Sequence, residues 1–525
     1  MVVVSGVITF DRVPFKTAPL QGLNPTVPVR SPARQVVVEA IDGLTVLADA
    51  TTDLAGRYAL IVPINQSMLV RAKAQMLKAG AAPTWDFRVR NNTNGDALYA
   101  LDSAAFTTST SNIDNKDLNA ATGWGTVNYT SERAAAPFAV LDTVFEAKQL
   151  ILSTAASTQF PQLNLFWSEN NRPATPFCPD NGNIATSSYV VFGSAPDNRD
   201  NCVPPQVGVD GIYILGDFSQ GDTDEFDQHV IAHEFGHYVE DKFSRSDSIG
   251  GSHGGGDSLD LRVAFGEGWG NAYSAMVLGD PIYRDSAGGV SGDGGFNLEA
   301  NSTITEGWYS EASVGEILWD IFDAGTEPGD NVALGFAPIY SVMTNQQVDT
   351  DAVTSIFPFA NALRSANPSA AASIRDLLSG ESISGTDDFG AGETNSGGDV
   401  LPIYTSIALN QQVPSICSRS TAGNEDANKL GNRRLLRFVN DQSRIVTITA
   451  NGAAANAQSV AATDPDIYVL LQGTIVAFGA STVQGSEIIS QVPLAAGTYV
   501  IEVYDFDIDG AGNPAPRCMT VSIQG

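Results

Sequence analysis

The chain has 525 residues and carries 59 acidic side chains against 28 lysine and arginine side chains, which gives a net charge of −31. This length exceeds what one hydrophobic core needs and predicts about three domains. So negative a surface argues against binding to nucleic acid or to an anionic membrane, because both require basic patches. No run of about 18 apolar residues occurs, so we expect no membrane insertion, and the oligomeric state stays unknown.

Residues 1–85 form short runs of alternating apolar and polar side chains, separated by glycine, proline and aspartate, which predicts strands joined by turns. Val3–Phe10 and Ser67–Ala74 are two of these runs. Residues 36–63 resemble the small β-sandwich modules attached to carboxypeptidases and cell-surface proteins. The resemblance implies an accessory domain over residues 1–85 that acts as a binding module or as a spacer and has no catalytic group of its own.

Residues 86–415 are predicted to form a second domain of mixed helix and strand. A helical period runs through Ala136–Ser153, and Leu163–Trp167 has the composition of a strand. Two further strands are expected just before the histidine motif, at residues 188–192 and 211–218. Helices are expected after it, at residues 261–278, 310–324 and 351–380.

All four histidines lie within 25 residues, and His233, Glu234 and His237 form the pattern H-E-x-x-H. Positions four apart lie on one face of a helix, so both imidazoles can bind one metal ion. Glu234 can then reach a water molecule bound to that metal. The pattern predicts a zinc-dependent hydrolase, with a chance match in an ordinary helix as the alternative.

Asp222, Asp224, Glu225 and Asp227 precede this predicted helix. Asp222 with Glu225 is a plausible N-terminal cap. Asp222, Asp224 and Asp227 are also a weak candidate for a calcium site, although capping is the simpler explanation of these side chains.

A catalytic zinc takes three protein ligands, so one more is needed. The metzincin signature requires a histidine at position 243, where this chain has Phe243, and that class is excluded. His229 and Asp241 each lie eight residues from one of the two ligands. That spacing is about 12 Å along a helix, too far for a common metal, so we expect His229 to lie behind a ligand or at the surface.

Glu267 is the better third ligand, because residues 261–278 are predicted to form a helix that returns toward the first one. Three nearby glycines would let this helix pack closely against the zinc helix, at a cost of about 1 kcal/mol each relative to alanine. Asn271, one turn later, could orient a ligand histidine through its second ring nitrogen. The alternative is a glycine-rich packing helix in which Glu267 is merely solvated.

The pairing of H-E-F-G-H at residues 233–237 with G-E-G-W at residues 266–269 resembles the gluzincin proteases, most of all the fungalysin family. The hairpin at residues 190–218 resembles the thermolysin-like arrangement, and residues 313–319 resemble a later fungalysin helix. The resemblance covers roughly residues 130–325.

This resemblance implies a thermolysin-like zincin domain with zinc on His233, His237 and Glu267. Glu234 would be the catalytic acid and base. A peptide substrate would add as a further strand along residues 211–218.

Thermolysin-like enzymes also place a histidine or tyrosine near the oxyanion, and here the chain departs from the fungalysin pattern. Ala312 stands where that family has its histidine. Tyr309, one turn earlier, is our candidate donor, and a core tyrosine is an equally good interpretation. His253, on a glycine-rich loop, is a second candidate for contact with substrate or oxyanion, against a solvated loop histidine.

Residues 418–525 are again predicted to be strands, and residues 464–507 resemble the pre-peptidase C-terminal domain, a β-sandwich appended to secreted bacterial proteases. Asp505, Asp507 and Asp509 are spaced as in a calcium loop, so Ca²⁺ is a second candidate cofactor beside Zn²⁺. Pro516 stands where an EF-hand needs glutamate, which favours a simple turn.

The four cysteines contain no C-x-x-C pair, which argues against a structural zinc site. We expect disulfides Cys178–Cys202 and Cys417–Cys518, with free buried thiols as the alternative.

The sequence thus predicts a multidomain α+β protein in which a thermolysin-like zincin domain is flanked by two β-sandwich domains. The expected function is that of a secreted or cell-surface zinc endopeptidase acting on protein or peptide substrates. Residues 1–6 lack the features of a secretory signal, so we expect any signal to have been removed. The alternatives are an aminopeptidase of the same class, for which a G-x-M-E-N motif is missing, and a degenerate peptidase that serves in adhesion or binding.

Overall fold

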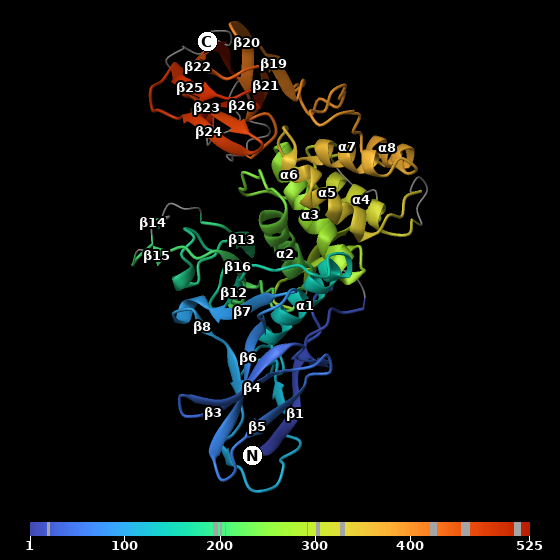
Figure 1. Ribbon diagram of the computed structural model, residues 1–525, viewed down its shortest axis with the longest axis vertical. Coiled ribbons are helices and arrows are strands. Elements are labelled where there is room, and N and C mark those ends of the chain that lie inside the picture. Colours follow the sequence, from blue (N-terminus) through green and yellow to red (C-terminus); the bar gives the residue numbers. More distant parts are fainter. Residues whose placement is uncertain are drawn as a thin grey trace. The chain divides into compact units, whose positions relative to one another are not determined.

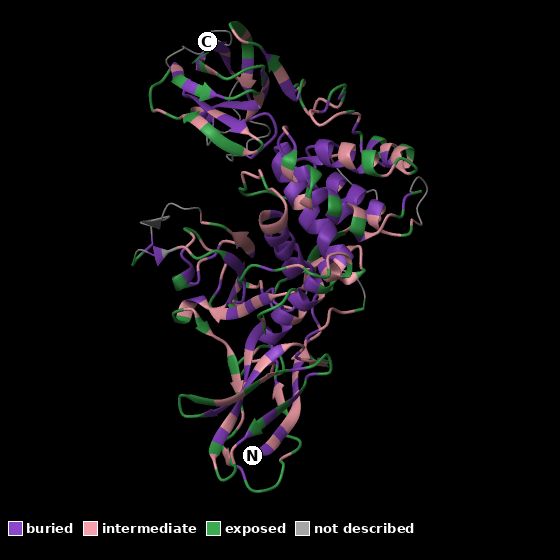
Figure 2. Cartoon of the chain, viewed as in Figure 1, coloured by how far each residue is buried: buried purple, intermediate pink, exposed green. Residues whose placement is uncertain are grey.

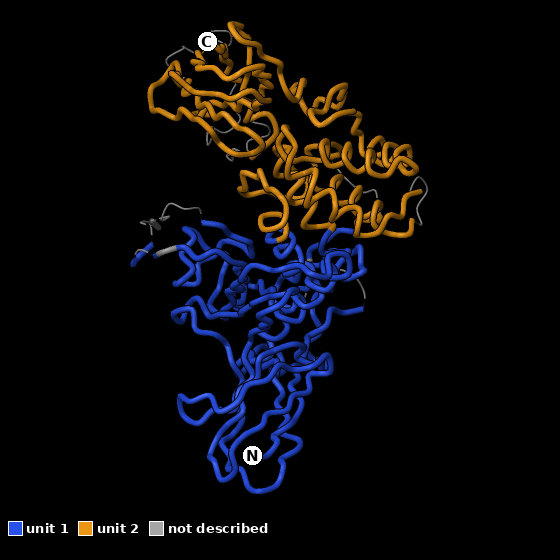
Figure 3. The backbone as a smooth tube through the Cα atoms, in the orientation of Figure 1, with its two compact units in different colours: residues 1–238, 273–297 blue, residues 239–272, 298–525 orange. Residues whose placement is uncertain are grey.

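The computed structural model describes residues 1–17, 21–192, 198–199, 202–204, 206–290, 292–300, 305–325, 331–419, 428–452, 463–508 and 516–525. The chain has a mixed α/β fold with several β-sandwich-like sheets (Figure 1). It divides into two compact units (Figure 3). The first comprises residues 1–238 and 273–297, and the second comprises residues 239–272 and 298–525.

The first unit is organised around one large sheet. Its strand order is β13 (Ser188–Val190), β16 (Gly211–Ile214), β12 (Leu163–Trp167), β7 (Trp85–Asn91), β6 (Ser67–Lys78), β3 (Val36–Asp42), β4 (Thr45–Thr51). Three short strands pair along β6 and β7, namely β8 (Ala97–Leu98), β9 (Ala100–Asp102) and β10 (Phe106–Thr107). Strands β3, β4 and β6, which belong to the predicted domain of residues 1–85, therefore share a sheet with strands of the predicted second domain, because β6 pairs with β7 and β7 pairs in parallel with β12.

A smaller sheet and one long helix complete the body of this unit. The sheet has the order β11 (Leu118–Ala120), β1 (Val2–Arg12), β2 (Val29–Pro32), and β5 (Arg57–Val62) pairs with β1. Helix α1 (Ala136–Thr154) has Pro137 in its first turn, where a missing N–H costs nothing. Arg12 and Arg34 both form ion pairs with Asp142 of α1, at 2.9 and 2.6 Å, and so fasten the helix beside β1.

Two antiparallel hairpins that the sequence did not predict also belong to the first unit. They are β14 (Asn198–Arg199) with β15 (Gln206–Val207), and β17 (Ile282–Ala287) with β18 (Gly292–Asn297). The hairpin β17–β18 follows the glycine-rich helix in sequence, and its strand β17 returns to the segment before the histidine helix through a backbone bridge between Ala287 and Asp222.

The two motif-bearing helices are α2 (Gln228–Phe243) and α3 (Leu261–Leu278). Both are predicted correctly in type, and α3 has the predicted bounds. The expected cap is wrong, because α2 begins only at Gln228 and the Glu225 carboxylate instead accepts a hydrogen bond from Arg133 at 2.7 Å. Arg133 and Glu225 form a buried ion pair, so Glu225 is engaged away from the helix end.

The second unit contains the remaining helices. They are α4 (Glu311–Phe322), α5 (Phe336–Thr344), α6 (Gln346–Asp349), α7 (Ile356–Ala366) and α8 (Ala371–Gly380). The single helix expected at residues 351–380 is broken, because Asn367 precedes Pro368 and a residue before proline avoids the helical region. Gly268 of α3 sits where a Cβ atom would lie 2.5 Å from the Val314 side chain, so glycine permits α3 to approach α4.

A C-terminal β-sandwich is part of the second unit. One sheet has the order β19 (Tyr404–Ile407), β21 (Arg434–Asn440), β26 (Gly497–Asp505), β23 (Pro465–Leu471), β24 (Thr474–Gly479). The other has the order β20 (Gln411–Ser418), β27 (Arg517–Gln524), β22 (Arg444–Gly452), β25 (Ser486–Leu494). Their inner faces bury one apolar core that includes Leu436, Ile448 and Ile501 (Figure 2).

A buried ion-pair network links this sandwich to the start of α3. Arg262, which is 2% exposed, donates to Asp260 at 2.8 Å and to Glu502 of β26 at 2.6 Å. Arg433 pairs with the other oxygen of Glu502. Removing one partner of such a network leaves an uncompensated buried charge, which is strongly destabilising.

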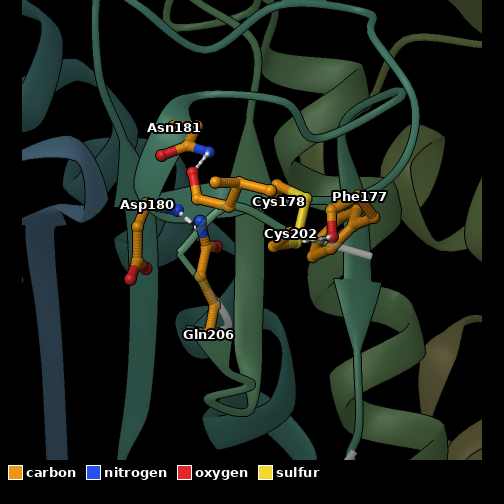
Figure 4. Close-up of a disulfide and its surroundings, with 7 residues drawn as sticks. Phe177, Cys178, Asp180, Asn181, Cys202 and Gln206 are labelled. Atoms are coloured by element: carbon orange, nitrogen blue, oxygen red, sulfur yellow. Dashed lines mark hydrogen bonds between the residues drawn. A yellow bond between two sulfur atoms is a disulfide. The ribbon is translucent and has the colours of Figure 1, made fainter. Parts of the chain in front are cut away.

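Both predicted disulfides are confirmed. Cys417–Cys518 joins the adjacent strands β20 and β27. Cys178–Cys202 closes a loop of the first unit (Figure 4). Two hydrogen bonds support that loop, since the Asp180 N–H donates to Gln206 at 3.0 Å and the Asn181 amide donates to the Val203 carbonyl at 3.3 Å.

Candidate metal centre

Helix α2 places His233 and His237 on successive turns of one face. Their Nε2 atoms lie 3.0 Å apart, and their rings are nearly perpendicular at a centroid distance of 4.7 Å. The opposite side of the helix is fixed in the core, where Phe235 and Tyr238 both contact the ring of Phe87. The Tyr238 hydroxyl also donates to the Pro161 carbonyl at 2.7 Å. The rotation of α2, and hence the direction of its histidines, is set by this packing.

Glu234 lies between the two histidines and is 8% exposed. Its Oε2 accepts a hydrogen bond from the backbone N–H of Tyr189 at 2.6 Å. Tyr189 belongs to β13, which comes first in the strand order of the large sheet. The predicted edge at residues 211–218 is wrong, because β16 pairs with β13 on one side and with β12 on the other. Among the strands that the structure describes, β13 therefore stands at the end of the sheet beside Glu234.

Glu267 is half-buried on α3, and the ligand atoms of His233, His237 and Glu267 all lie within 4.8 Å of one another. Zinc bonds of about 2.0–2.1 Å in tetrahedral geometry separate two ligand atoms by about 3.3 Å, close to the 3.0 Å found for the two imidazoles. Two imidazoles and one carboxylate are also a common donor set of catalytic zinc. The residues present therefore fit a zinc ion.

His253 lies beside the proposed third ligand. Its Nε2 is 3.3 Å from Glu267 and 3.5 Å from Glu311, and its Nδ1 is 3.0 Å from the Gly251 carbonyl oxygen. Burial lowers the pKa of the imidazole, but the hydrogen bond to Glu267 and the charges of Glu267 and Glu311 outweigh it and raise the pKa to about 9. His253 is thus an exposed loop histidine that is engaged with two carboxylates, and its contact with substrate or oxyanion stays a prediction.

Tyr309 has the contacts of a core tyrosine. It is 6% exposed, its hydroxyl donates to the Asn395 side chain at 2.9 Å, and its ring packs edge-on against Trp308. Asn271 is buried on α3, one turn beyond Glu267. The roles of Tyr309 as oxyanion donor and of Asn271 as orienting residue stay predictions.

His229 is buried, with 4% of its surface exposed, so a surface position is wrong for it. Its Nε2 lies 3.2 Å from the Asp280 carbonyl oxygen, and burial lowers its pKa to about 4. His229 is accordingly a neutral core histidine.

The sequence did not single out Tyr283 of β17. Its ring lies 6.0 Å from that of His233 and 5.4 Å from that of His229, and it stacks on Phe296 at 4.9 Å. Burial, followed by the charges of Asp285 and Glu234, raises the pKa of Tyr283 well above its ordinary value. Tyr283 could have been identified only by predicting the hairpin β17–β18. The glycine-rich turn of that hairpin obscures the alternating pattern of its strands.

Asp505 and Asp507 lie at the end of β26, and Asp509 is outside the described residues. Arg517 forms ion pairs with Asp505 at 3.3 Å and with Asp507 at 3.6 Å. Arg517 thus partly neutralises these two carboxylates, and a calcium ion at this turn stays a prediction.

In the described part of the chain, none of the helices has the length and apolar character of a membrane span. The two disulfides fit an oxidising environment.

No protein-family model and no curated protein matches this chain. Among solved structures it is similar to the pre-peptidase C-terminal domain of a collagenase from Bacillus anthracis, at 10% identity and a TM-score of 0.17 over 23% of this chain and 93% of that one. It is also similar to PliG, a periplasmic lysozyme inhibitor of Aeromonas hydrophila, at 15% identity and a TM-score of 0.14 over 23% and 97%. A third match is CorA, a surface-associated copper-binding protein of Methylomicrobium album BG8, at 12% identity and a TM-score of 0.17 over 23% and 98%. The chain therefore has a weak structural similarity, over about a quarter of its length, to proteins that include a pre-peptidase C-terminal domain.

Proposed function

We propose that this chain is a secreted zinc-dependent endopeptidase with a thermolysin-like catalytic region. The observation that carries the proposal is the pair of imidazoles on α2, with Nε2 atoms 3.0 Å apart and the Glu234 carboxylate between them in sequence. His233, His237 and Glu267 would hold the metal. When bound there, zinc supplies Lewis acidity to the scissile carbonyl and makes the attacking water more acidic.

Glu234 is the general base and acid of this proposal. It takes a proton from the attacking water and delivers it to the leaving amine. The Tyr189 N–H fixes one oxygen of its carboxylate at 2.6 Å, which restricts the rotation of the side chain. This positioning matters because proton transfer requires hydrogen-bond distance to the reacting groups.

Strand β13 would bind the substrate. In an antiparallel pair the N–H and C=O of one residue point to the same side, so the Tyr189 N–H that contacts Glu234 marks the outer edge of β13. An extended peptide that adds along this edge would pass beside the catalytic carboxylate. Backbone pairing of this kind suits an endopeptidase, because it needs no free substrate terminus.

Metal analysis combined with casein hydrolysis tests the function. We expect one zinc per chain, cleavage that stops with a chelator, and recovery when zinc is restored. Zinc without cleavage of casein or of a mixed peptide library would favour a degenerate peptidase that serves in binding. Release of single N-terminal residues only would favour the aminopeptidase.

A further inference from the structure

A second group of ligand atoms lies where the chain enters α2. Oxygens of Asp222, Asp224 and Asp285 all lie within 4.8 Å of one another, and Asp227 is close enough for its charge to act on Asp224. We call these four residues the aspartate cluster. Three of them precede α2, and Asp285 lies on β17.

The two central carboxylates are fully enclosed. Asp224 is 3% exposed and Asp227 is 0% exposed. One oxygen of each has a partner, since Asp224 accepts from the Ser187 hydroxyl and Asp227 accepts from the Ser286 N–H at 2.6 Å. The Oδ1 atoms of Asp222, Asp224 and Asp227 are buried without a hydrogen-bond partner. A buried acceptor of this kind costs about 1–3 kcal/mol if nothing satisfies it, and more when it is charged.

Basic side chains do not compensate these carboxylates. Among the described residues, no lysine or arginine forms an ion pair with Asp222, Asp224 or Asp227, and the neighbouring Arg133 is engaged by Glu225. Burial is the largest cause, and together with the negative charges of neighbouring acids it outweighs the local hydrogen bonds and raises the pKa of all three carboxyls. A cluster of acids in this position is unfavourable unless protons or a cation neutralise it.

The arrangement fits a cation better than shared protons. Calcium binds oxygen ligands at about 2.3–2.6 Å, so two ligands on opposite sides of one ion are about 4.6–5.2 Å apart. The oxygens of Asp222, Asp224 and Asp285, all within 4.8 Å of one another, are close enough to share one such ion. Thr223, which stands between Asp222 and Asp224 in sequence and is fully buried, also has a hydroxyl oxygen without a partner. The unpartnered atoms are all oxygens, which is the donor type that calcium prefers and zinc does not.

We propose that the aspartate cluster binds one divalent cation of the calcium type, at a site separate from the histidine centre. The bound ion joins the segment before α2 to the hairpin β17–β18. Several contacts already connect these segments, among them the bond from the Ser286 N–H to Asp227, the bond from the Ser286 hydroxyl to the Thr223 carbonyl, and the backbone bridge between Asp222 and Ala287. Tyr283 of the same strand packs against His233, so the ion would also restrict the motion of the His233 side chain, a proposed zinc ligand.

Calcium titration of the whole chain tests this site. The protein is stripped of metal by dialysis against EDTA, and CaCl₂ is added while heat of binding and melting temperature are recorded. We expect saturable one-to-one binding and a higher melting temperature. The same result is expected for the double variant His233→Ala/His237→Ala, which separates this site from the zinc proposal.

Variants identify the residues involved. Asp224→Asn should weaken calcium binding by about tenfold or more, because the site loses a ligand charge. Asp222→Asn, at a half-buried position, should also weaken calcium binding. It replaces the first variant in the test if Asp224→Asn does not fold. Asp49→Asn, at an exposed position on β4, is the matched control and should bind like the wild type.

The two variants also distinguish a cation site from a purely structural cluster. Without calcium, Asp224→Asn should melt no lower than the wild type, because it removes a buried charge. A melting temperature that falls equally with and without calcium would contradict the site. So would the absence of any calcium-dependent heat or stabilisation in the wild type at millimolar CaCl₂.

Discussion

The histidine pair of α2 and the aspartate cluster before the same helix are close in sequence but differ in the origin of their ligands. The two imidazoles come from one helix, and local helical geometry alone brings their nitrogens to 3.0 Å. The carboxylates come from a loop and from a strand more than fifty residues later, so only the folded hairpin β17–β18 brings Asp285 to Asp224.

The groups also differ in what happens without a metal. Neutral imidazoles can hydrogen-bond to each other and to water, so an empty histidine pair costs little. Buried carboxylates repel one another and lose hydration, so an empty aspartate cluster destabilises the fold. We therefore expect zinc to govern activity and the second cation to govern stability.

Removal of a zinc ligand should have the largest effect on activity. His237→Ala should weaken zinc binding by at least about 100-fold, since the loss of even an outer-shell partner costs up to that much. A zinc titration measures the loss of affinity, and a peptidase assay measures the loss of activity. Asp241→Asn, one turn further along α2, is the control and should keep both zinc and activity. Equal zinc affinity in the two variants would contradict the assignment.

Glu234→Gln should leave zinc binding intact and reduce turnover by roughly 10²- to 10⁴-fold, because the amide cannot accept the proton of the water. The kinetic constants should show the loss in kcat, with KM little changed. An unchanged melting temperature would exclude a folding defect as the cause. Activity within a few-fold of the wild type would show that Glu234 is not the base.

A smaller effect is expected from glycine in α3. Gly268→Ala places a Cβ atom 2.5 Å from Val314 and 2.8 Å from the Glu311 carbonyl oxygen, so α3 and α4 must separate. We expect a loss of about 1–3 kcal/mol in the free energy of unfolding, measured by denaturant titration. Gly380→Ala, at the end of α8 with no neighbouring atom within 4 Å, is the matched control and should not destabilise. Equal effects would show that α3 and α4 are not closely packed there.

The smallest effect is expected in the pH dependence of stability, which should show the contribution of the aspartate cluster. The pKa of Asp224 and of Asp227 is raised above the ordinary value of 3.8 by burial and neighbouring acids. Groups whose pKa is higher in the folded state stabilise it below the unfolded pKa and lose that contribution as pH rises through the folded pKa. In EDTA the melting temperature should therefore fall as pH rises above about 4, and calcium should reduce the fall. The same slope with and without calcium would contradict this expectation.

The sequence revealed those features that local rules determine. The spacing of His233 and His237 follows from helical periodicity, and the bounds of α3 follow from its apolar pattern. The disulfide pairing was also predicted, because Cys178 and Cys202 lie within one predicted domain, and Cys417 directly precedes the predicted domain that contains Cys518.

Features that depend on long-range contacts were not predicted. The strands of residues 1–85 were placed in a separate module, although β6 and β7 carry their sheet on to β12, because nothing local marks where a sheet ends. Asp222 was interpreted chiefly as a cap, with a calcium site on Asp222, Asp224 and Asp227 as the weaker alternative. Asp285 was missed, because its hairpin has a glycine-rich turn and no clear strand pattern. Tyr283 was missed for the same reason.

Elemental analysis of zinc in the wild type and in His233→Ala/His237→Ala, after exposure of both to zinc and calcium and removal of excess metal, tests the central claim most directly. We predict one zinc per wild-type chain, none in the double variant, and the same calcium content in both. Equal zinc in the two proteins, or no zinc in the wild type, would contradict the assignment of a zinc centre to α2.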